Sequence, residues 1–320
     1  MTASAPHTPV LLDRVVSLFL DAPAGVVVDA TVGAGGHAHA VTQARLERDG
    51  TAHLVGLDRD PVALALAEER LAPLRPAATV ELVRTRFDAL PRVLDDLEVP
   101  AVAGILLDLG ISSMHIDAAE RGFSYRNDGP LDMRMDPDLP TSADDMINRW
   151  EPTEIARVLR TYAEERFADR ISRAVVAARP ITSTAALAEI VRDAIPAAAR
   201  RTGGHPATRT FQALRIAVND ELGALDAVLP TVIDRLKPGG VAVVLSYHSL
   251  EDRRVKRAFA AAATGCICPP QLAVCACGQL PLVEHLVRRP ERPSSEEVAA
   301  NPRATSALLR AVRRLEGPSR

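Results

Sequence analysis

The sequence has no hydrophobic stretch long enough to cross a membrane, because nowhere in its 320 residues do 18 apolar residues run together. Its first residues also lack a basic segment followed by an apolar one, which is the pattern of a secretory signal. Apolar residues nevertheless make up 47% of the chain, as in a folded globular protein. We therefore expect a cytoplasmic protein with no membrane partner, long enough for one large domain or two ordinary ones.

Lysine is almost absent, since it occurs only at positions 237 and 256 and nearly all of the 38 basic residues are arginine. The formal net charge is −3, so the overall electrostatic field does not point to a nucleic-acid partner. Any basic surface for a nucleic acid must therefore be local. Solvated helix faces are the simpler explanation of the short arginine runs.

Cysteine is scarce and confined to one segment. The four cysteines form two Cys-x-Cys pairs, Cys266 with Cys268 and Cys275 with Cys277. In a reducing compartment such clustering favours metal ligation over disulfides. The spacing differs from the commoner Cys-x-x-Cys zinc knuckle, and no nearby histidine completes a known pattern. Structural zinc and reduced, small apolar side chains both remain open, and no metal ligand is assigned from the sequence.

Short apolar runs rich in valine, isoleucine and leucine recur along the chain, each bounded by turn residues. They lie at 26–30, 53–57, 79–83, 103–109 and 241–246. Runs of this kind are typical of buried parallel strands. Helix-length segments separate the first four, and strands that alternate with helices predict an α/β fold with a doubly wound sheet. Two late runs, at 282–287 and 306–312, are expected to complete the sheet as an antiparallel edge.

A long interval interrupts this alternation. The fourth run ends at residue 109 and the fifth begins at residue 241, whereas a βαβ unit takes roughly 30 residues. Helical patterns fill the interval at 151–163, 168–178, 184–194 and 207–225. We therefore predict an inserted helical subdomain over 112–205 and a sheet domain formed by 1–111 and 206–320, with the helix at 207–225 returning the chain to the sheet.

The segment around Gly33 combines a strand with a glycine turn. An apolar run that ends near Asp29 leads into Gly33, Gly35 and Ala38, which are spaced as G-x-G-x-x-A ahead of a helix. The missing side chains let the backbone turn tightly and approach a ligand at the helix N-terminus. Asp58, which follows the second run, is placed to accept hydrogen bonds from two ribose hydroxyls. Together these residues predict a nucleotide-cofactor site.

Asp29 discriminates between two cofactors. It stands four positions before Gly33, where a carboxylate would repel the pyrophosphate of a nicotinamide dinucleotide. S-adenosylmethionine has no phosphate and carries an ammonium and a sulfonium, which a carboxylate attracts. The pattern favours S-adenosylmethionine, and a nicotinamide-dependent oxidoreductase is the main alternative. Asp108, in the fourth run, is expected beside the glycine turn, because the first and fourth strands of such sheets are neighbours at the switch point.

Seven motifs, spread in order over nearly the whole chain, resemble the signatures of the MraW/RsmH family of methyltransferases. They lie at 7–12, 31–37, 107–113, 121–124, 128–136, 205–212 and 249–253. The resemblance implies a class I S-adenosylmethionine-dependent methyltransferase sheet whose helical insertion binds the substrate. It also implies methyl transfer to the exocyclic N4 amine of one cytidine in small-subunit (16S) ribosomal RNA, with the RNA or the assembled small ribosomal subunit as partner.

The resemblance further implies which residues bind the cofactor, S-adenosyl-L-methionine. By their positions in the motifs they are Gly35, Gly36, His37, Asp58, Phe87, Asp108 and His115. Relatives often have glutamine at the position of His115, and a histidine ring there still donates or accepts one hydrogen bond.

Direct in-line displacement suffices for this reaction, so the chemistry needs good positioning and an oxygen acceptor for the amine N–H. Asp108 is the candidate catalytic residue, with a backbone carbonyl of the turn at 109–112 and Asp132 as alternatives. Phe123 and Tyr125 are expected either to stack on a flipped-out cytosine or to pack the insertion. A non-catalytic ribosome-assembly factor is the second alternative function, and the sequence leaves open whether the chain forms homo-oligomers.

Overall fold

The computed structural model describes residues 9–201, 205–269 and 276–316. Within these ranges no helix combines the length and apolar character that a bilayer crossing requires. The chain divides into two compact units, one formed by Met1–Gly110 with Gly223–Arg320 and the other by Ile111–Leu222. We call them the sheet unit and the inserted unit.

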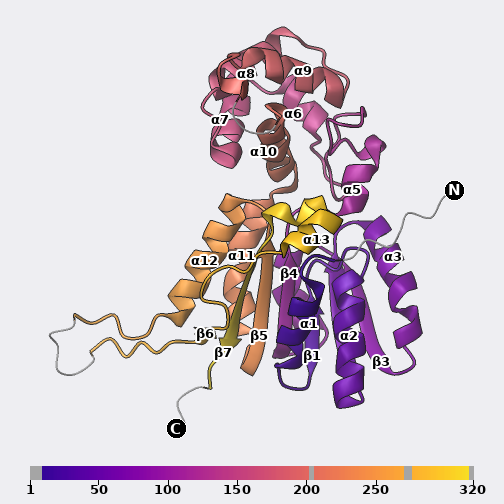
Figure 1. The fold of residues 1–320 in the computed structure, drawn as a ribbon, viewed down its shortest axis with the longest axis vertical. Helices are drawn as coiled ribbons and strands as arrows, with labels where there is room; N and C mark the ends of the chain where they lie inside the picture. The colour runs from indigo at the N-terminus through magenta and orange to yellow at the C-terminus, as the bar shows by residue number, and fades with distance from the viewer. Residues whose placement is uncertain (1–8, 202–204, 270–275, 317–320) are drawn as a thin grey trace. The chain divides into compact units, whose positions relative to one another are not determined.

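The sheet unit is built on one sheet with the strand order β3-β2-β1-β4-β5-β7-β6 (Figure 1). The first five strands in this order run parallel, and β7 and β6 join as an antiparallel edge. This order confirms the predicted doubly wound α/β sheet and its antiparallel edge. The strands are β1 (Val26–Asp29), β2 (Ala52–Asp58), β3 (Ala78–Arg84), β4 (Val102–Asp108), β5 (Leu236–Ser246), β6 (Val283–His285) and β7 (Leu308–Arg314).

Helices cover both faces of this sheet. Along β4 the buried side chains alternate, with Ile105 and Leu107 in one hydrophobic cluster and Leu106 in another. One face carries α1 (Leu12–Leu20), α2 (Gly36–Asp49) and α3 (Pro61–Leu71), and the other carries α4 (Leu90–Asp96), α11 (Glu221–Asp234) and α12 (Ser249–Ala263). Shorter elements are α13 (Ser295–Ala300) and the 3₁₀ turns η1 (Ala72–Leu74), η2 (Phe87–Ala89) and η5 (Pro302–Ser306). Both faces of the parallel strands are therefore buried, which explains their continuous apolar sequence.

The inserted unit is helical and has its own hydrophobic core. Its elements are α5 (Ser113–Asp117), η3 (Ala119–Arg121), α6 (Ala143–Arg149), α7 (Pro152–Ala163), α8 (Ala168–Ala177), α9 (Thr184–Ala194), η4 (Ala199–Arg201) and α10 (Ala207–Asn219). The predicted helices at 151–163, 168–178 and 184–194 correspond to α7, α8 and α9.

The helix expected at 207–225 is two helices. Asp220 has a left-handed backbone with φ of 48° and separates α10 from α11. Phe211, Leu214 and Val218 of α10 belong to the core of the inserted unit, whereas Leu225 of α11 packs with the sheet. The inserted unit therefore ends at Leu222, later than the predicted 205, because the apolar face of α10 is buried among the inserted helices.

Candidate active site

Three neighbouring strands of the sheet each end on an aspartate. Strand β1 ends at Asp29, β2 at Asp58 and β4 at Asp108, and β1 pairs in parallel with both of the others. The carboxyl ends of parallel strands share one edge of a sheet, and ligands of open α/β sheets bind outside that edge. The three acids singled out in the sequence therefore meet at the edge where a cofactor is expected.

Asp29 is the most deeply buried of the three, with 3% of its surface exposed. Its pKa is raised to about 8, chiefly by burial, and the charges of Asp108 and Asp58 add to the rise. A 3.2 Å hydrogen bond that its Oδ1 accepts from the Thr31 N–H opposes the shift. At neutral pH this carboxyl group therefore keeps its proton unless a cation lies nearby.

Asp108 is tied to two other strand ends. The Tyr247 hydroxyl, just beyond β5, donates to Asp108 Oδ1 at 2.8 Å. The backbone N–H of Asp108 donates to Thr31 Oγ1 at 2.7 Å. Burial raises the pKa of the Asp108 carboxyl group, while the neighbouring His37 and the Tyr247 hydrogen bond act to lower it. A quarter of the side chain, 25%, remains exposed at the edge of the sheet, so this carboxyl group is accessible to a substrate.

His37 links Asp108 to the segment before α1. Its Nε2 atom lies 2.9 Å from the carbonyl oxygen of Val10 and its Nδ1 atom lies 3.5 Å from Asp108 Oδ2. A carbonyl oxygen only accepts, so the hydrogen between His37 and Val10 belongs to Nε2. One further proton between His37 Nδ1 and Asp108 Oδ2 would let these two atoms share a hydrogen bond. The pair can thus hold a proton on the carboxyl group or on the ring.

The glycine turn between β1 and α2 adopts a backbone that other residues rarely take. Gly33 has φ of 52° and Gly35 has φ of 76°, both in the left-handed region. A Cβ atom on Gly35 would also lie 3.2 Å from the Cα of Ala67 in α3, and one on Gly36 would lie 2.5 Å from Pro9 Cγ. Gly35 is the N-cap of α2 and offers no side chain to its first N–H groups. These groups are the usual binding point for a ligand at such a turn.

Asp58 fixes the other side of the turn. Its Oδ2 accepts from the Gly33 N–H and its Oδ1 from the Asp60 N–H, each at 2.9 Å. Asp60 in turn caps α3 through the Val62 N–H at 2.8 Å. The predicted ribose-binding acid is therefore also the residue that holds the glycine turn in place.

Two further predicted cofactor residues lie in different units. Phe87 opens η2, directly after β3, and is half-buried against the sheet cluster that includes α4. His115 lies in α5 of the inserted unit and is 6% exposed. Its Nδ1 is 3.2 Å from the hydroxyl of Ser112, and its ring centroid is 4.9 Å from that of Phe123.

Of the two roles that the sequence left open for Phe123 and Tyr125, the structure shows packing within the inserted unit. Phe123 is 7% exposed within the core of the inserted unit. Tyr125 stacks on His205 with ring centroids 4.6 Å apart and meets the edge of Phe211 at 5.3 Å. Their ring faces are thus already used inside the inserted unit.

Asp132 is also engaged by a neighbour. Arg134 donates to both of its carboxylate oxygens, from Nε at 2.7 Å and from Nη2 at 3.0 Å, and also bonds the carbonyls of Pro137 and Leu139. Burial acts to raise the pKa of Asp132, but the hydrogen bonds and charge of Arg134 outweigh it and leave that pKa below its ordinary value. This pair holds a loop, which makes Asp132 a weaker candidate acceptor than Asp108.

The sequence placed Tyr247 after the fifth strand, where it could line the substrate pocket, but it did not reveal the hydrogen bonds that Thr31 and Tyr247 make. Thr31 occupies a position that is usually glycine in this type of strand-turn motif, and its hydroxyl supplies the bond that joins the turn to β4. Tyr247 follows β5, the neighbour of β4. Its position just past a strand end was the available signal, although only the structure shows that it reaches Asp108.

The chain is similar over nearly its whole length to known methyltransferases. A sequence model described as the MraW methylase family matches residues 4–315. A ribosomal RNA small subunit methyltransferase H of Acidothermus cellulolyticus is 57% identical over 315 residues, covering 97% of this chain and 94% of that protein. A protein of the same name from Symbiobacterium thermophilum is 52% identical over 313 residues, covering 97% of each chain. A solved rRNA methylase structure from Streptococcus thermophilus aligns with a TM-score of 0.39 and 11% identity, over 95% of this chain and 94% of that one.

Proposed function

Because this chain belongs to the MraW methylase family, we propose that it transfers the methyl group of S-adenosyl-L-methionine to the exocyclic N4 amine of one cytidine in small-subunit (16S) ribosomal RNA. Family membership confirms the predicted methyltransferase activity and its donor, and together with the strand order it confirms the predicted fold class. The structural observation that carries the proposal is the convergence of Asp29, Asp58 and Asp108 around a glycine turn that opens α2.

The residues at this edge fit the donor. S-adenosylmethionine supplies, when bound, a methyl group made electrophilic by a positively charged sulfur. Asp29 is a buried acid whose ionised form a nearby cation would stabilise. Asp58 places a carboxyl group at the end of β2, next to the glycine turn. A dinucleotide would instead bring a pyrophosphate toward three acids, which is unfavourable. The donor-binding residues that we propose are Gly35, Gly36, His37, Asp58, Phe87, Asp108 and His115.

Asp108 has the geometry for the catalytic role. A cytosine amine must give up one proton as it gains a methyl group, and its lone pair is best aimed when one N–H is held by an oxygen acceptor. Asp108 Oδ1 is oriented by Tyr247, and Oδ2 faces His37 Nδ1. The released proton therefore has a place on Oδ2 or on the ring nitrogen next to it. We assign Asp108 as the residue that positions the amine and accepts its proton.

We propose further that the inserted unit binds the RNA and that the reaction takes place in the cytoplasm. The core of the inserted unit supports the first of these, because a compact body of its own can present a rigid surface to a large partner. The substrate is either the assembled small subunit or its free RNA.

The proposal is tested by incubating the full chain with S-adenosylmethionine carrying an isotopically labelled methyl group. Assembled small subunits and naked 16S RNA, both from cells that lack the modification, serve as parallel substrates. We expect mass spectrometry of the digested RNA to place the label on N4 of a single cytidine in at least one of them. Label on protein, on a ring carbon, or on neither substrate would overturn the proposal.

Two controls separate the alternatives. RNA with uridine in place of the mapped cytidine should take up no label. The chain should bind S-adenosylhomocysteine and not a nicotinamide dinucleotide, because an oxidoreductase would show the reverse. A non-catalytic assembly factor would bind S-adenosylhomocysteine but transfer no methyl group.

A further inference from the structure

The segment between α12 and β6 projects away from the sheet (Figure 1). We call its described residues, 264–269 and 276–282, the cysteine arm. Leu282 N–H donates to the Ala262 carbonyl at 2.8 Å, and the Gln279 side chain donates to the Thr264 carbonyl at 3.2 Å. These bonds tie the two halves of the arm together where it leaves the sheet unit.

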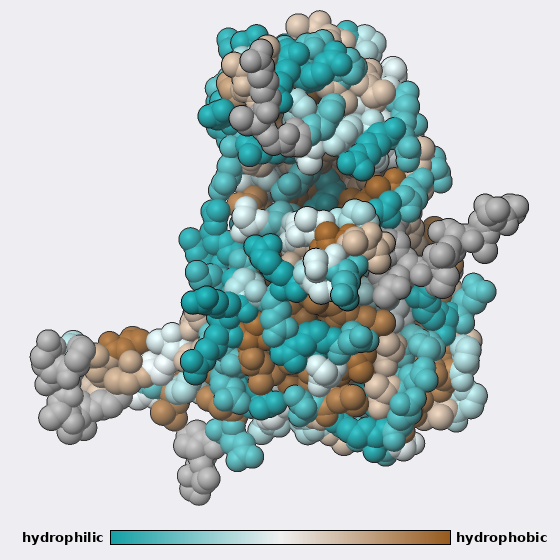
Figure 2. All heavy atoms as spheres, in the orientation of Figure 1, coloured by the Kyte–Doolittle hydropathy of each residue, from teal (hydrophilic) through white to brown (hydrophobic). Residues whose placement is uncertain are grey.

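The arm has little hydrophobic packing of its own. Among the described residues, the large hydrophobic side chains with the highest exposure include three from the arm, Ile267 at 64%, Leu280 at 54% and Leu282 at 42%. Figure 2 shows hydrophobic residues on the surface of this projection. A segment that buries so little apolar area cannot fix its conformation by the hydrophobic effect, and small structures of this kind usually rely on disulfides or metals.

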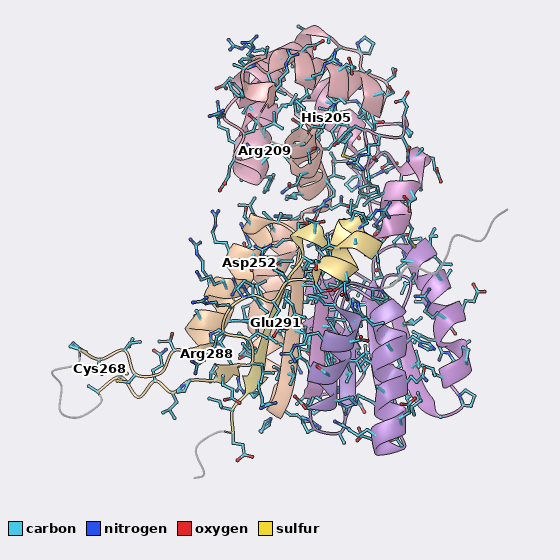
Figure 3. All side chains as sticks on the ribbon, in the orientation of Figure 1. His205, Arg209, Asp252, Cys268, Arg288 and Glu291 are labelled. Carbon is cyan, nitrogen blue, oxygen red and sulfur yellow. The ribbon has the colours of Figure 1, made fainter. Side chains whose placement is uncertain are left out.

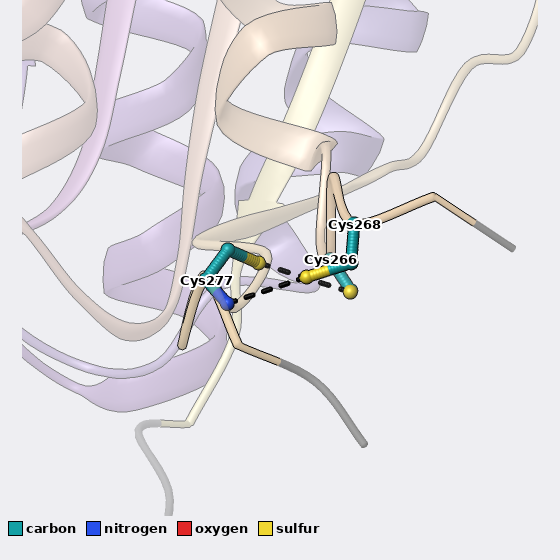
Figure 4. A group of neighbouring side chains, drawn as sticks. All are labelled: Cys266, Cys268 and Cys277. Atoms are coloured by element: carbon teal, nitrogen blue, oxygen red, sulfur yellow. Dashed lines mark hydrogen bonds between the residues drawn. The ribbon is translucent and has the colours of Figure 1, made fainter. Parts of the chain in front are cut away.

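Three thiols meet on this arm. Cys266, Cys268 and Cys277 each direct a sulfur to one place, with all three sulfur atoms within 4.8 Å of one another (Figure 4). The sulfurs of Cys266 and Cys277 are 3.7 Å apart. Two thiolates bound tetrahedrally to zinc at about 2.3 Å lie about 3.8 Å apart. The observed separation therefore suits two ligands of one zinc ion, and it is far longer than the roughly 2.05 Å of a disulfide bond.

The backbone also prepares one of these sulfurs to carry a negative charge. The N–H groups of Ala276 and Cys277 both point at the sulfur of Cys268, each at 3.3 Å. Two hydrogen bonds from N–H groups favour a thiolate over a neutral thiol, and the thiolate is the form that binds metal. This contact links the two described halves of the arm.

We propose that Cys266, Cys268 and Cys277 bind one structural Zn²⁺ ion as thiolates. Three sulfur donors favour zinc over hard cations such as magnesium or calcium, which prefer oxygen ligands. Figure 3 shows Cys268 on the projecting part of the sheet unit, apart from Asp252 and Glu291 on its body. The bound ion stabilises the arm by joining its two halves.

The proposal is tested on the full chain, expressed with zinc and purified under reducing conditions. We expect about one zinc per chain by elemental analysis, and X-ray absorption showing at least three sulfur neighbours at about 2.3 Å. Replacing zinc with Co²⁺ should give the sulfur-to-metal charge-transfer absorption of a tetrahedral thiolate site. Well under one zinc per chain, with no uptake of added Zn²⁺ or Co²⁺, would overturn it, as would a disulfide between Cys266 and Cys277.

Single substitutions on the arm test whether its cysteines bind the zinc ion. Cys268→Ser and Cys277→Ser should each lose zinc to a chelator that does not strip the wild type. Ile267→Ser is the matched control, because it changes an exposed side chain between two ligands and removes no thiol; it should retain its zinc. Full retention in both cysteine variants would assign the metal elsewhere and contradict the site. S-adenosylhomocysteine binding, measured on the same samples, shows that each variant is folded.

Discussion

The strand-end site and the cysteine arm hold their functional groups by opposite means. At the strand ends, the packed sheet holds Asp29 in a place where its ionised form is strongly disfavoured. On the arm, Cys266, Cys268 and Cys277 come together with almost no buried surface around them. The first site is fixed before its ligand arrives, whereas the second gains its rigidity from the ligand. A large packed core can therefore stabilise a buried carboxyl group that by itself destabilises the fold, whereas a projecting segment with little packing cannot.

The largest effect is expected from a change at Asp108, the partly buried acid proposed to accept the amine proton. Asp108→Asn keeps an acceptor for the Tyr247 hydroxyl but cannot take up the amine proton. We expect the single-turnover rate of methyl transfer at saturating S-adenosylmethionine to fall by about 10²-fold or more. Asp132→Asn is the comparison variant and should slow transfer much less, because Asp132 is paired with Arg134. An Asp108→Asn rate equal to that of the wild type would remove this residue from the chemistry.

A second prediction concerns the donor rather than the methyl acceptor. Asp58→Ala should weaken S-adenosylhomocysteine binding by roughly 1.5–3 kcal/mol, because hydrogen bonds to a charged acceptor are lost. This corresponds to about 10- to 150-fold in Kd by calorimetry. Asp58→Asn is the matched control; it can still accept from the Gly33 N–H and should lose less. Undiminished affinity in Asp58→Ala would exclude Asp58 from the donor site.

A third prediction uses the pKa of Asp29, which is about 8 when no cation is nearby. Bound S-adenosylmethionine is a cation and favours the ionised form of Asp29, so its binding releases the Asp29 proton. The affinity of the protein for S-adenosylmethionine should therefore rise with pH and level off above about 8. The slope is at most about tenfold per pH unit. In Asp29→Asn the pH dependence contributed by the Asp29 carboxyl group should vanish. The ligand titrates in the same way with both proteins, so the ratio of the wild-type affinity to the variant affinity isolates the contribution of Asp29. A ratio that does not vary between pH 6 and 9 would contradict the assignment.

The same carboxyl group gives a stability effect of the opposite sign. Between its ordinary pKa of 3.8 and about 8, the unfolded chain has released the Asp29 proton while the folded chain retains it. The folded state then binds more protons, so its contribution to the free energy of unfolding falls as the pH rises and is constant above about 8. Thermal melts of the ligand-free protein should show this fall, and Asp29→Asn should reduce it.

The smallest effect on donor binding and stability is expected from a change in the cysteine arm. Cys268→Ser should leave the affinity for S-adenosylhomocysteine and the main thermal transition unchanged, because the arm adds little to the buried core. Limited proteolysis should nevertheless cut the arm faster once its proposed metal is lost. A large loss of donor affinity in this variant would show that the two regions are coupled.

Much of the fold could be predicted from the sequence because its signals were local. The apolar runs identified β1 to β5, and the spacing of their acids placed Asp29, Asp58 and Asp108 at one edge. The prediction of one helix at 207–225 was wrong because the sequence does not show that Asp220 adopts a left-handed backbone. Its apolar stripe is equally compatible with the sheet and with the inserted core, and only tertiary packing decides between them.

Other parts of the site depend on contacts between residues far apart in the chain. Glu251, in the first turn of α12, accepts the backbone N–H groups of Tyr247 and His248. Asp252 is engaged by Arg310 of β7 at 2.7 and 3.0 Å. No local pattern reports such a partner, just as none reports that Tyr247 reaches Asp108.

Because Gly35 approaches α3 closely, the proposed donor site depends on a residue that has no proposed role in the chemistry. The Cα of Ala67 would lie 3.2 Å from a side chain on Gly35, and Ala67 itself is fully buried. Any larger residue at 67 must push against the glycine turn. A mutational scan scored by S-adenosylhomocysteine binding should therefore show that Ala67 does not tolerate larger side chains, although it lies in a helix outside the strand ends.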